Sequence, residues 1–135
     1  MKHTNDVKPC PSCEDKLKQA HPQLANWFRE DVKSKYPDAH ISWSYRDRMN
    51  QNQAFAEGKS KLVFPLSAHN KSDDQGNPCA LALDLFQLAS NGMGCWPWAY
   101  FKQIAEEMKA SRQDMKWGGD FKSLGDADHF ELQMS

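Results

Sequence analysis

The chain has 135 residues and a formal net charge of −1, from 17 basic and 18 acidic side chains. This length fits one domain with a single hydrophobic core. The balanced charge, without a basic stripe, excludes nucleic acid as an expected partner. No apolar run is long enough to cross a membrane. We therefore expect residues 10–135 to form a single domain behind a flexible tail of residues 1–9.

The first residues carry no apolar stretch of the kind that forms a secretory signal. We therefore expect the protein to be made in the cytoplasm without a signal peptide. Cys10 and Cys13 have the spacing of a zinc knuckle, but no second pair of this kind follows. Our interpretation is that both are reduced thiols at a helix start. A disulfide between them or an incidental metal site is the alternative.

Apolar residues recur at helical spacing from Cys13 to about Lys35. Pro22 interrupts the pattern and predicts the start of a second helix, with His21 at its terminus and not in a metal site. His40 lies in a segment that alternates as a strand, and we interpret it as a surface residue, with a site role as the less favoured alternative. The alternation would place the residues of each face as follows: Ile41, Trp43 and Tyr45 on one, and His40, Ser42 and Ser44 on the other.

Further along, Asp47 can cap a helix over residues 48–57 that Gly58 ends. Residues 87–94 predict a turn-rich connection, residues 96–112 a helix and residues 115–117 a short strand. The order of helices and strands predicts an α+β fold: a small, mostly antiparallel sheet with helices packed on one face.

Asp84 stands inside the apolar stretch of residues 80–86, where the side chains of a strand would alternate between two faces. Leu81, Leu83 and Leu85 would share one face, and Asp84 would share the other with alanines, which leave room above the sheet. A carboxylate in so apolar a strand must be solvated, paired or bound to a metal. A metal site and a buried ion pair, for example with Arg46, are the two interpretations.

The last strand repeats this arrangement. From Asp128 onward the apolar residues would take one face, and His129 and Glu131 the other. With His69, in the polar loop before Asp84, these strands offer two nitrogen ligands and one oxygen ligand. Three such protein ligands, with a fourth position left to water, are the composition of a catalytic zinc site. The candidate metal ligands are therefore His69, Asp84 and His129.

A family resemblance rests on these residues. The motifs are Ser67-x-His69, Ala82-x-Asp84 and Asp126-x-x-His129-Phe-Glu131, with Tyr45-Arg46, Gln51-Asn52 and Gly58-Lys-Ser60 upstream. Together they resemble the M15 zinc peptidases, which include bacterial D,D-carboxypeptidases, D-Ala-D-Ala dipeptidases and the L-alanyl-D-glutamate endopeptidases of phage endolysins. The resemblance covers about residues 38–133. It implies the α+β fold of the D,D-peptidases, shared with Hedgehog signalling domains, and one zinc ion per chain.

One departure concerns spacing. Asp84 follows His69 by fifteen residues, which is longer than the family's usual spacing. The extra residues, from Lys71 to Pro78, are polar and rich in turn formers, so we expect an exposed loop insertion beside the cleft that influences substrate choice. If His69 is not the first ligand, His40 is the next candidate.

The resemblance also implies roles for further residues. A carboxylate three residues before the last histidine is the family's general base, which points to Asp126. Asp128 competes for this role, but by strand parity it would point away from His129. Glu131, on the face of His129, is expected to orient a ligand.

Arg46 matches an arginine that faces the substrate in the family and stabilises a developing oxyanion or a carboxylate. An ion pair with Asp47 or another nearby acid is the alternative. Ser60 and Ser67 are expected to contact substrate or to support the ligands, and simple turn or loop hydroxyls are an equally open interpretation.

These expectations combine into a zinc metallopeptidase that hydrolyses stem-peptide bonds of peptidoglycan, with L-alanyl-D-glutamate endopeptidase activity favoured, as in an endolysin. The alternatives are a D-alanyl-D-alanine carboxypeptidase or dipeptidase, and a non-catalytic zinc-containing module that binds the cell wall. We expect a monomer that inserts into no membrane and reaches the cell wall after release, with a holin-like partner.

Overall fold

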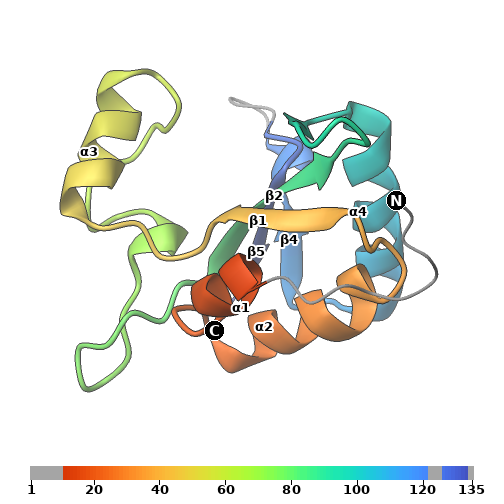
Figure 1. Ribbon diagram of the computed structural model, residues 1–135. Coiled ribbons are helices and arrows are strands. Elements are labelled where there is room, and N and C mark those ends of the chain that lie inside the picture. Colours follow the sequence, from red (N-terminus) through yellow and green to blue (C-terminus); the bar gives the residue numbers. More distant parts are fainter. Residues whose placement is uncertain (1–10, 122–125, 134–135) are drawn as a thin grey trace.

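The computed structural model describes residues 11–121 and 126–133 (Figure 1). The expected tail, residues 1–9, therefore lies outside the described residues. Helices and short helical turns are α1 (Pro11–Leu17), α2 (Pro22–Trp27), the π-helix η1 (Phe28–Lys33), α3 (Arg48–Ala56), the 3₁₀ turn η2 (Ala68–Asn70), α4 (Trp98–Ser111) and the 3₁₀ turn η3 (Gly118–Asp120). Strands are β1 (Ala39–Trp43), β2 (Ala82–Leu88), β3 (Gly94–Cys95), β4 (Met115–Trp117) and β5 (His129–Leu132).

The sheet has the strand order β1-β2-β5-β4, and every pairing between these strands is antiparallel. The two-residue strand β3 pairs with the end of β2 and lies where the sequence predicted only a turn-rich connection. The fold is a small α+β domain with an antiparallel sheet, which confirms the predicted fold class.

The hydrophobic core lies on one face of this sheet. Alternate residues of the two central strands point into it, among them Leu83, Leu85 and Phe130, which are fully buried. The same core holds apolar side chains of α2 and α4, such as Leu24 and Phe101. The helix α3 lies apart from the other helices, beyond the end of β1 (Figure 1). The opposite face of the central strands is thus left for polar residues.

A bulge in β1 changes the predicted strand faces. The pairing of β1 with β2 shifts register between Ile41 and Trp43, and a bulge adds one residue to one strand. Trp43 is 36% exposed, whereas Ser44 is 2% exposed. The prediction that Trp43 shares the buried face of Ile41 is therefore wrong, because alternation holds only while the ladder is regular.

The helix starts that the sequence predicted at His21 and Asp47 are confirmed. His21 caps α2, where its Nδ1 accepts a hydrogen bond from the backbone N–H of Gln23 at 3.1 Å. Asp47 caps α3 and accepts from the backbone N–H of Asn50 at 2.9 Å. Among the described residues, no helix is long and apolar enough to span a membrane.

The cysteines differ from the expectation. Cys13 is disulfide-bonded, so the prediction of a reduced thiol is wrong at this position, and Cys10 lies outside the described residues. Cys79 and Cys95 are free.

Candidate metal centre and active site

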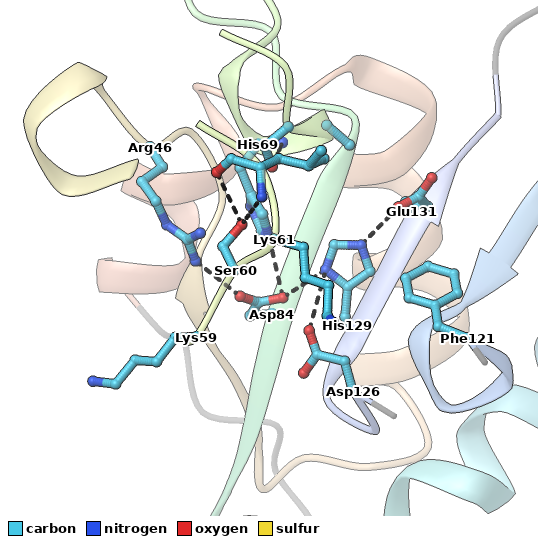
Figure 2. A pocket seen from close by; sticks show the side chains of 13 residues that line it. Arg46, Lys59, Ser60, Lys61, His69, Asp84, Phe121, Asp126, His129 and Glu131 are labelled. Atoms are coloured by element: carbon cyan, nitrogen blue, oxygen red, sulfur yellow. Dashed lines mark hydrogen bonds and ion pairs between the residues drawn. The ribbon is translucent and has the colours of Figure 1, made fainter. Parts of the chain in front are cut away.

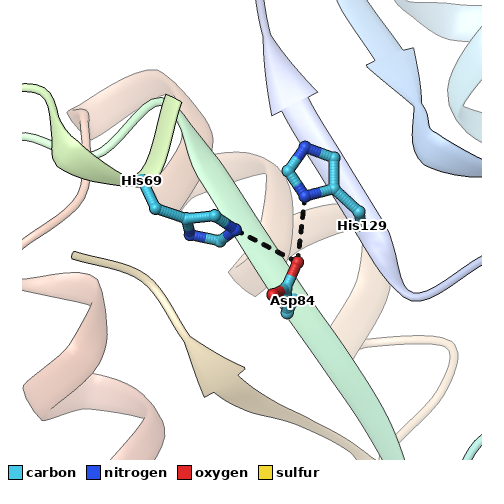
Figure 3. A group of neighbouring side chains, drawn as sticks. All are labelled: His69, Asp84 and His129. Atoms are coloured by element: carbon cyan, nitrogen blue, oxygen red, sulfur yellow. Dashed lines mark hydrogen bonds and ion pairs between the residues drawn. The ribbon is translucent and has the colours of Figure 1, made fainter. Parts of the chain in front are cut away.

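Three side chains from separate elements converge on the polar face of the sheet. They are His69 from η2, Asp84 from β2 and His129 from β5, and their ligand atoms lie within 4.8 Å of one another (Figure 3). Asp84 Oδ1 is 3.2 Å from His69 Nε2 and 3.0 Å from His129 Nδ1. Asp84 and His129 are direct partners in the antiparallel ladder, so their side chains stand on the same face.

The turn that carries His69 is fixed by hydrogen bonds from both sides. Ser67 Oγ accepts from the backbone N–H of His69 at 3.1 Å, and the backbone N–H of Arg46 donates to the His69 carbonyl at 2.9 Å. The backbone N–H of Leu81 donates to the carbonyl of Ala68 at 2.9 Å. Ser67 thus serves as a turn hydroxyl beside the cavity, which is one of the two roles left open by the sequence.

The outer nitrogen of each histidine ring has its own acceptor. His69 Nδ1 lies 2.7 Å from the carbonyl oxygen of Ser44, and His129 Nε2 lies 2.7 Å from Glu131 Oε1. Because a carbonyl or carboxylate oxygen only accepts, these ring nitrogens donate. In the neutral rings the lone pairs are then at His69 Nε2 and His129 Nδ1, which both face Asp84. The residues therefore fit a metal ion, since metal-bound histidines are commonly oriented by such acceptors.

The electrostatics keep the carboxylate of this cluster charged. Burial opposes the charged form of Asp84, but the charges and hydrogen bonds of His69 and His129 lower its pKa below the ordinary value. Burial likewise opposes the charged form of His129, yet its hydrogen bonds to Asp84 and Glu131 raise its pKa to about 10. The cluster thus binds positive charge, either as protons or as a cation.

Arg46 is held by Asp84. Its Nη2 lies 3.2 Å from Asp84 Oδ2, its Nη1 donates to Gln51 Oε1 at 3.1 Å, and its side chain is 9% exposed. Its guanidinium also lies over the ring of Trp43, at 4.9 Å from the ring centroid. The structure has the ion pair between Arg46 and Asp84 that the sequence offered as one interpretation, while Asp47 caps α3. Arg46 also lines the cavity, and its role toward a substrate stays a prediction.

Gln51 is a buried residue of the site that the sequence reasoning missed. Its side chain is fully buried, and its Nε2 donates to Ser60 Oγ at 2.9 Å and to the Leu62 carbonyl at 2.6 Å. Its Oε1 accepts from Arg46 and from Asn70 Nδ2. One amide therefore joins α3, the segment of residues 60–62 and the His69 turn. The sequence contained one signal for it, because Gln51-Asn52 is among the motifs upstream that resemble the family. That motif alone did not indicate what Gln51 does.

Asp126 lies at the edge of the cluster, where its Oδ2 is 4.0 Å from His129 Nδ1 and its side chain is 34% exposed. Asp128 was predicted to point away from His129, and this prediction is wrong. Asp128 lies in a turn before β5, where strand parity does not apply, and ligand atoms of Asp84, Asp126 and Asp128 lie within 4.8 Å of one another. Burial, a hydrogen bond with Asp126 and the charge of Asp84 raise the pKa of Asp128 to about 9.

Gly118 permits this close packing. The backbone N–H of Asp126 donates to the Gly118 carbonyl at 3.0 Å. A Cβ at position 118 would overlap the Asp126 carbonyl oxygen and lie 2.8 Å from His129 Cβ. A side chain at this position would therefore move Asp126 away from the cluster.

A cavity of about 190 Å³ opens over the cluster. Besides the residues above, its lining includes Lys59, Ser60, Lys61, Leu62 and Phe121 (Figure 2). The insertion of residues 71–78 is mostly exposed, as predicted, but contributes no lining residue. Its influence on substrate choice stays a prediction. His40 does not line the cavity either and stacks on Phe86 instead.

The fold and this cluster define a small D-Ala-D-Ala peptidase-like domain with a candidate metal centre. In particular, the structure is similar to that of the L-Ala D-Glu endopeptidase ChiX of Serratia marcescens, with a TM-score of 0.69 and 25% sequence identity. The match covers 90% of this chain and 86% of that chain. No family model matches the chain. The likeness confirms the predicted fold and supports the resemblance to M15 zinc peptidases.

Proposed function

We propose that this protein is a zinc-dependent peptidase that hydrolyses the bond between L-alanine and D-glutamate in peptidoglycan stem peptides. The observation that carries the proposal is the orientation of the two histidines. Ser44 and Glu131 hold their outer nitrogens, so that two ring nitrogens and the Asp84 carboxylate converge beside Asp126. The structural similarity to an L-Ala D-Glu endopeptidase supports the choice of bond.

His69, Asp84 and His129 would hold the zinc ion. When bound, zinc supplies a water whose pKa is lowered to about 7 and polarises the carbonyl of the scissile bond. The ion pair with Arg46 keeps Asp84 Oδ2 occupied, which leaves Oδ1 turned toward both histidines. Arg46 would thus orient a ligand.

Asp126 would move the protons of the reaction. Its carboxylate accepts a proton from the attacking water while the water oxygen bonds to the carbonyl carbon of the scissile bond. The same proton then passes to the nitrogen of the leaving amine as the carbon–nitrogen bond breaks. Asp128, whose carboxyl group lies close to that of Asp126, would donate a hydrogen bond that holds Asp126 in place for both transfers. A carboxylate poised at the cluster favours an enzyme over a module that only binds the cell wall.

The test is to incubate the zinc-loaded protein with purified peptidoglycan and to identify the newly exposed termini. New N-terminal D-glutamate is the expected result, and the His69→Ala variant should release none. Free D-alanine or the dipeptide D-Ala-D-Ala would instead identify a carboxypeptidase or a dipeptidase. Binding to the cell wall without any release would identify a binding module. Access to the wall would follow release from the producing cell.

A further inference from the structure

Three lysine and arginine side chains line the cavity, and two of them have anionic partners. Arg46 pairs with the buried Asp84. Lys59 lies 3.1 Å from Glu57 and extends away from the cluster in Figure 2. Lys61 also lines the cavity and has no ion pair within the described part of the chain. It is therefore the cation that is available to a ligand.

The backbone around Lys61 is held in place. Its two neighbours, Ser60 and Leu62, both accept hydrogen bonds from the buried amide of Gln51, at 2.9 and 2.6 Å. The same amide accepts from Arg46. The backbone that carries Lys61 is thus held by the same residue that supports Arg46. Fixing the backbone lowers the conformational entropy that Lys61 loses when it binds an anion.

The charges that face Lys61 indicate what it can bind. Asp126 and Glu131 also line the cavity, so a cation at Lys61 would offset part of the repulsion that these carboxylates exert on an anionic peptide. The glutamate of an L-alanyl-D-glutamate unit has two carboxyl groups, and only one can continue the peptide chain. The other stays as a free carboxylate on the residue whose amine is the leaving group.

We propose that Lys61 binds this free carboxylate and makes the cavity selective for peptides with an acidic residue on the leaving-group side of the scissile bond. The inference rests on the proposed function, and it assigns recognition of the substrate anion to Lys61, because both terminal nitrogens of Arg46 are engaged within the protein.

The experiment compares two stem peptides that differ only at this group, one with the free carboxylate and one with the corresponding carboxamide. Lys61→Ala should lower kcat/KM for the carboxylate peptide about tenfold, mainly through KM, since one charge-assisted hydrogen bond is lost. It should leave the carboxamide peptide nearly unchanged, and Lys61→Arg should restore most of the loss. Lys102→Ala is the control, because Lys102 pairs with Glu106 on the exposed side of α4 and does not line the cavity, so the variant should change neither substrate.

An equal loss on both peptides, or no loss on either, would overturn the inference. Calorimetry then measures the affinity of each peptide for the zinc-loaded protein and for Lys61→Ala. These affinities distinguish failure of the inference from failure of the proposed function. If the parent protein cleaves neither peptide but binds the carboxylate form about tenfold more tightly in a Lys61-dependent way, the activity is wrong and the inference stands. If no Lys61-dependent preference exists in binding either, the inference is wrong as well.

Discussion

His129 Nε2 lies 2.7 Å from Oε1 of Glu131, two residues further along the same strand. The contact follows from strand geometry, because residues i and i+2 share one face of a strand. It fixes which ring nitrogen of His129 faces Asp84. The hydrogen bond to His129 also lowers the pKa of Glu131 against the effect of burial, so that the acceptor is an ionised carboxylate.

The first prediction concerns this pair. Glu131→Ala removes the acceptor that orients His129, and metal affinity should fall about 10–100-fold, as measured by competition with a chelator. Glu131→Gln keeps an acceptor oxygen and should lose less. Glu106→Ala is the control, because Glu106 pairs with Lys102 on the exposed side of α4. Unchanged affinity in Glu131→Ala would contradict an orienting role.

The second prediction concerns the ligands. The purified protein should contain one zinc ion per chain, and His69→Ala should lose nearly all of it, because two remaining ligands make a weak site. His40→Ala should keep its zinc, since His40 stacks on Phe86 away from the cavity. Metal analysis of the three proteins is the measurement. Full zinc in His69→Ala together with loss in His40→Ala would show that the wrong histidine has been assigned.

A third prediction separates the base from the ligands. Asp126→Asn removes a proton acceptor with little change of shape, so turnover should fall roughly 10²–10⁴-fold. Zinc content and thermal stability should stay close to those of the parent protein. Zinc analysis and single-turnover kinetics on the same sample are the measurements. If zinc is lost in parallel with activity, Asp126 is a ligand and not the base.

The fourth prediction concerns Asp128, for which the structure leads to a different expectation than the sequence. Strand parity predicts that Asp128→Asn is nearly silent, whereas ligand atoms of Asp128, Asp126 and Asp84 lie within 4.8 Å of one another in the structure. Asparagine still offers an N–H donor to Asp126, so most activity should survive. Asp128→Ala removes the donor, and kcat should fall about tenfold, the loss of one hydrogen bond to a charged group. Loss of turnover in Asp128→Asn but not in Asp126→Asn would reverse the two assignments.

The fifth prediction concerns Gly118. A methyl group at this position overlaps the Asp126 carbonyl oxygen, so Gly118→Ala should destabilise the protein by about 1–3 kcal/mol through overpacking. Activity per folded molecule should also fall, because Asp126 must shift. Gly92→Ala is the control: Gly92 has a φ of +84° with open space around it, so stability should drop while activity per folded molecule is kept. Denaturant unfolding and kinetics of both variants are the measurements.

Much of the candidate site could be predicted from the sequence, because strand alternation is a local property. Asp84 and His129 stand on the polar face of β2 and β5, opposite the leucines and phenylalanine that build the core. The strand β4 has the predicted bounds of residues 115–117. Helix caps at His21 and Asp47 were also correct. Each of these features depends on neighbours only a few residues away along the chain.

The tertiary structure decided the rest. The long spacing between His69 and Asp84 is compatible with one cluster because the loop of residues 71–78 lies exposed outside it. Arg46 pairs with Asp84, which lies 38 positions further along the chain. Gln51 donates to the carbonyl of Leu62, 11 positions further along. A bulge in β1 and a turn at Asp128 override strand parity, because hydrogen bonds to other segments fix the backbone there. Such contacts depend on how distant segments meet, which periodicity along one segment does not specify.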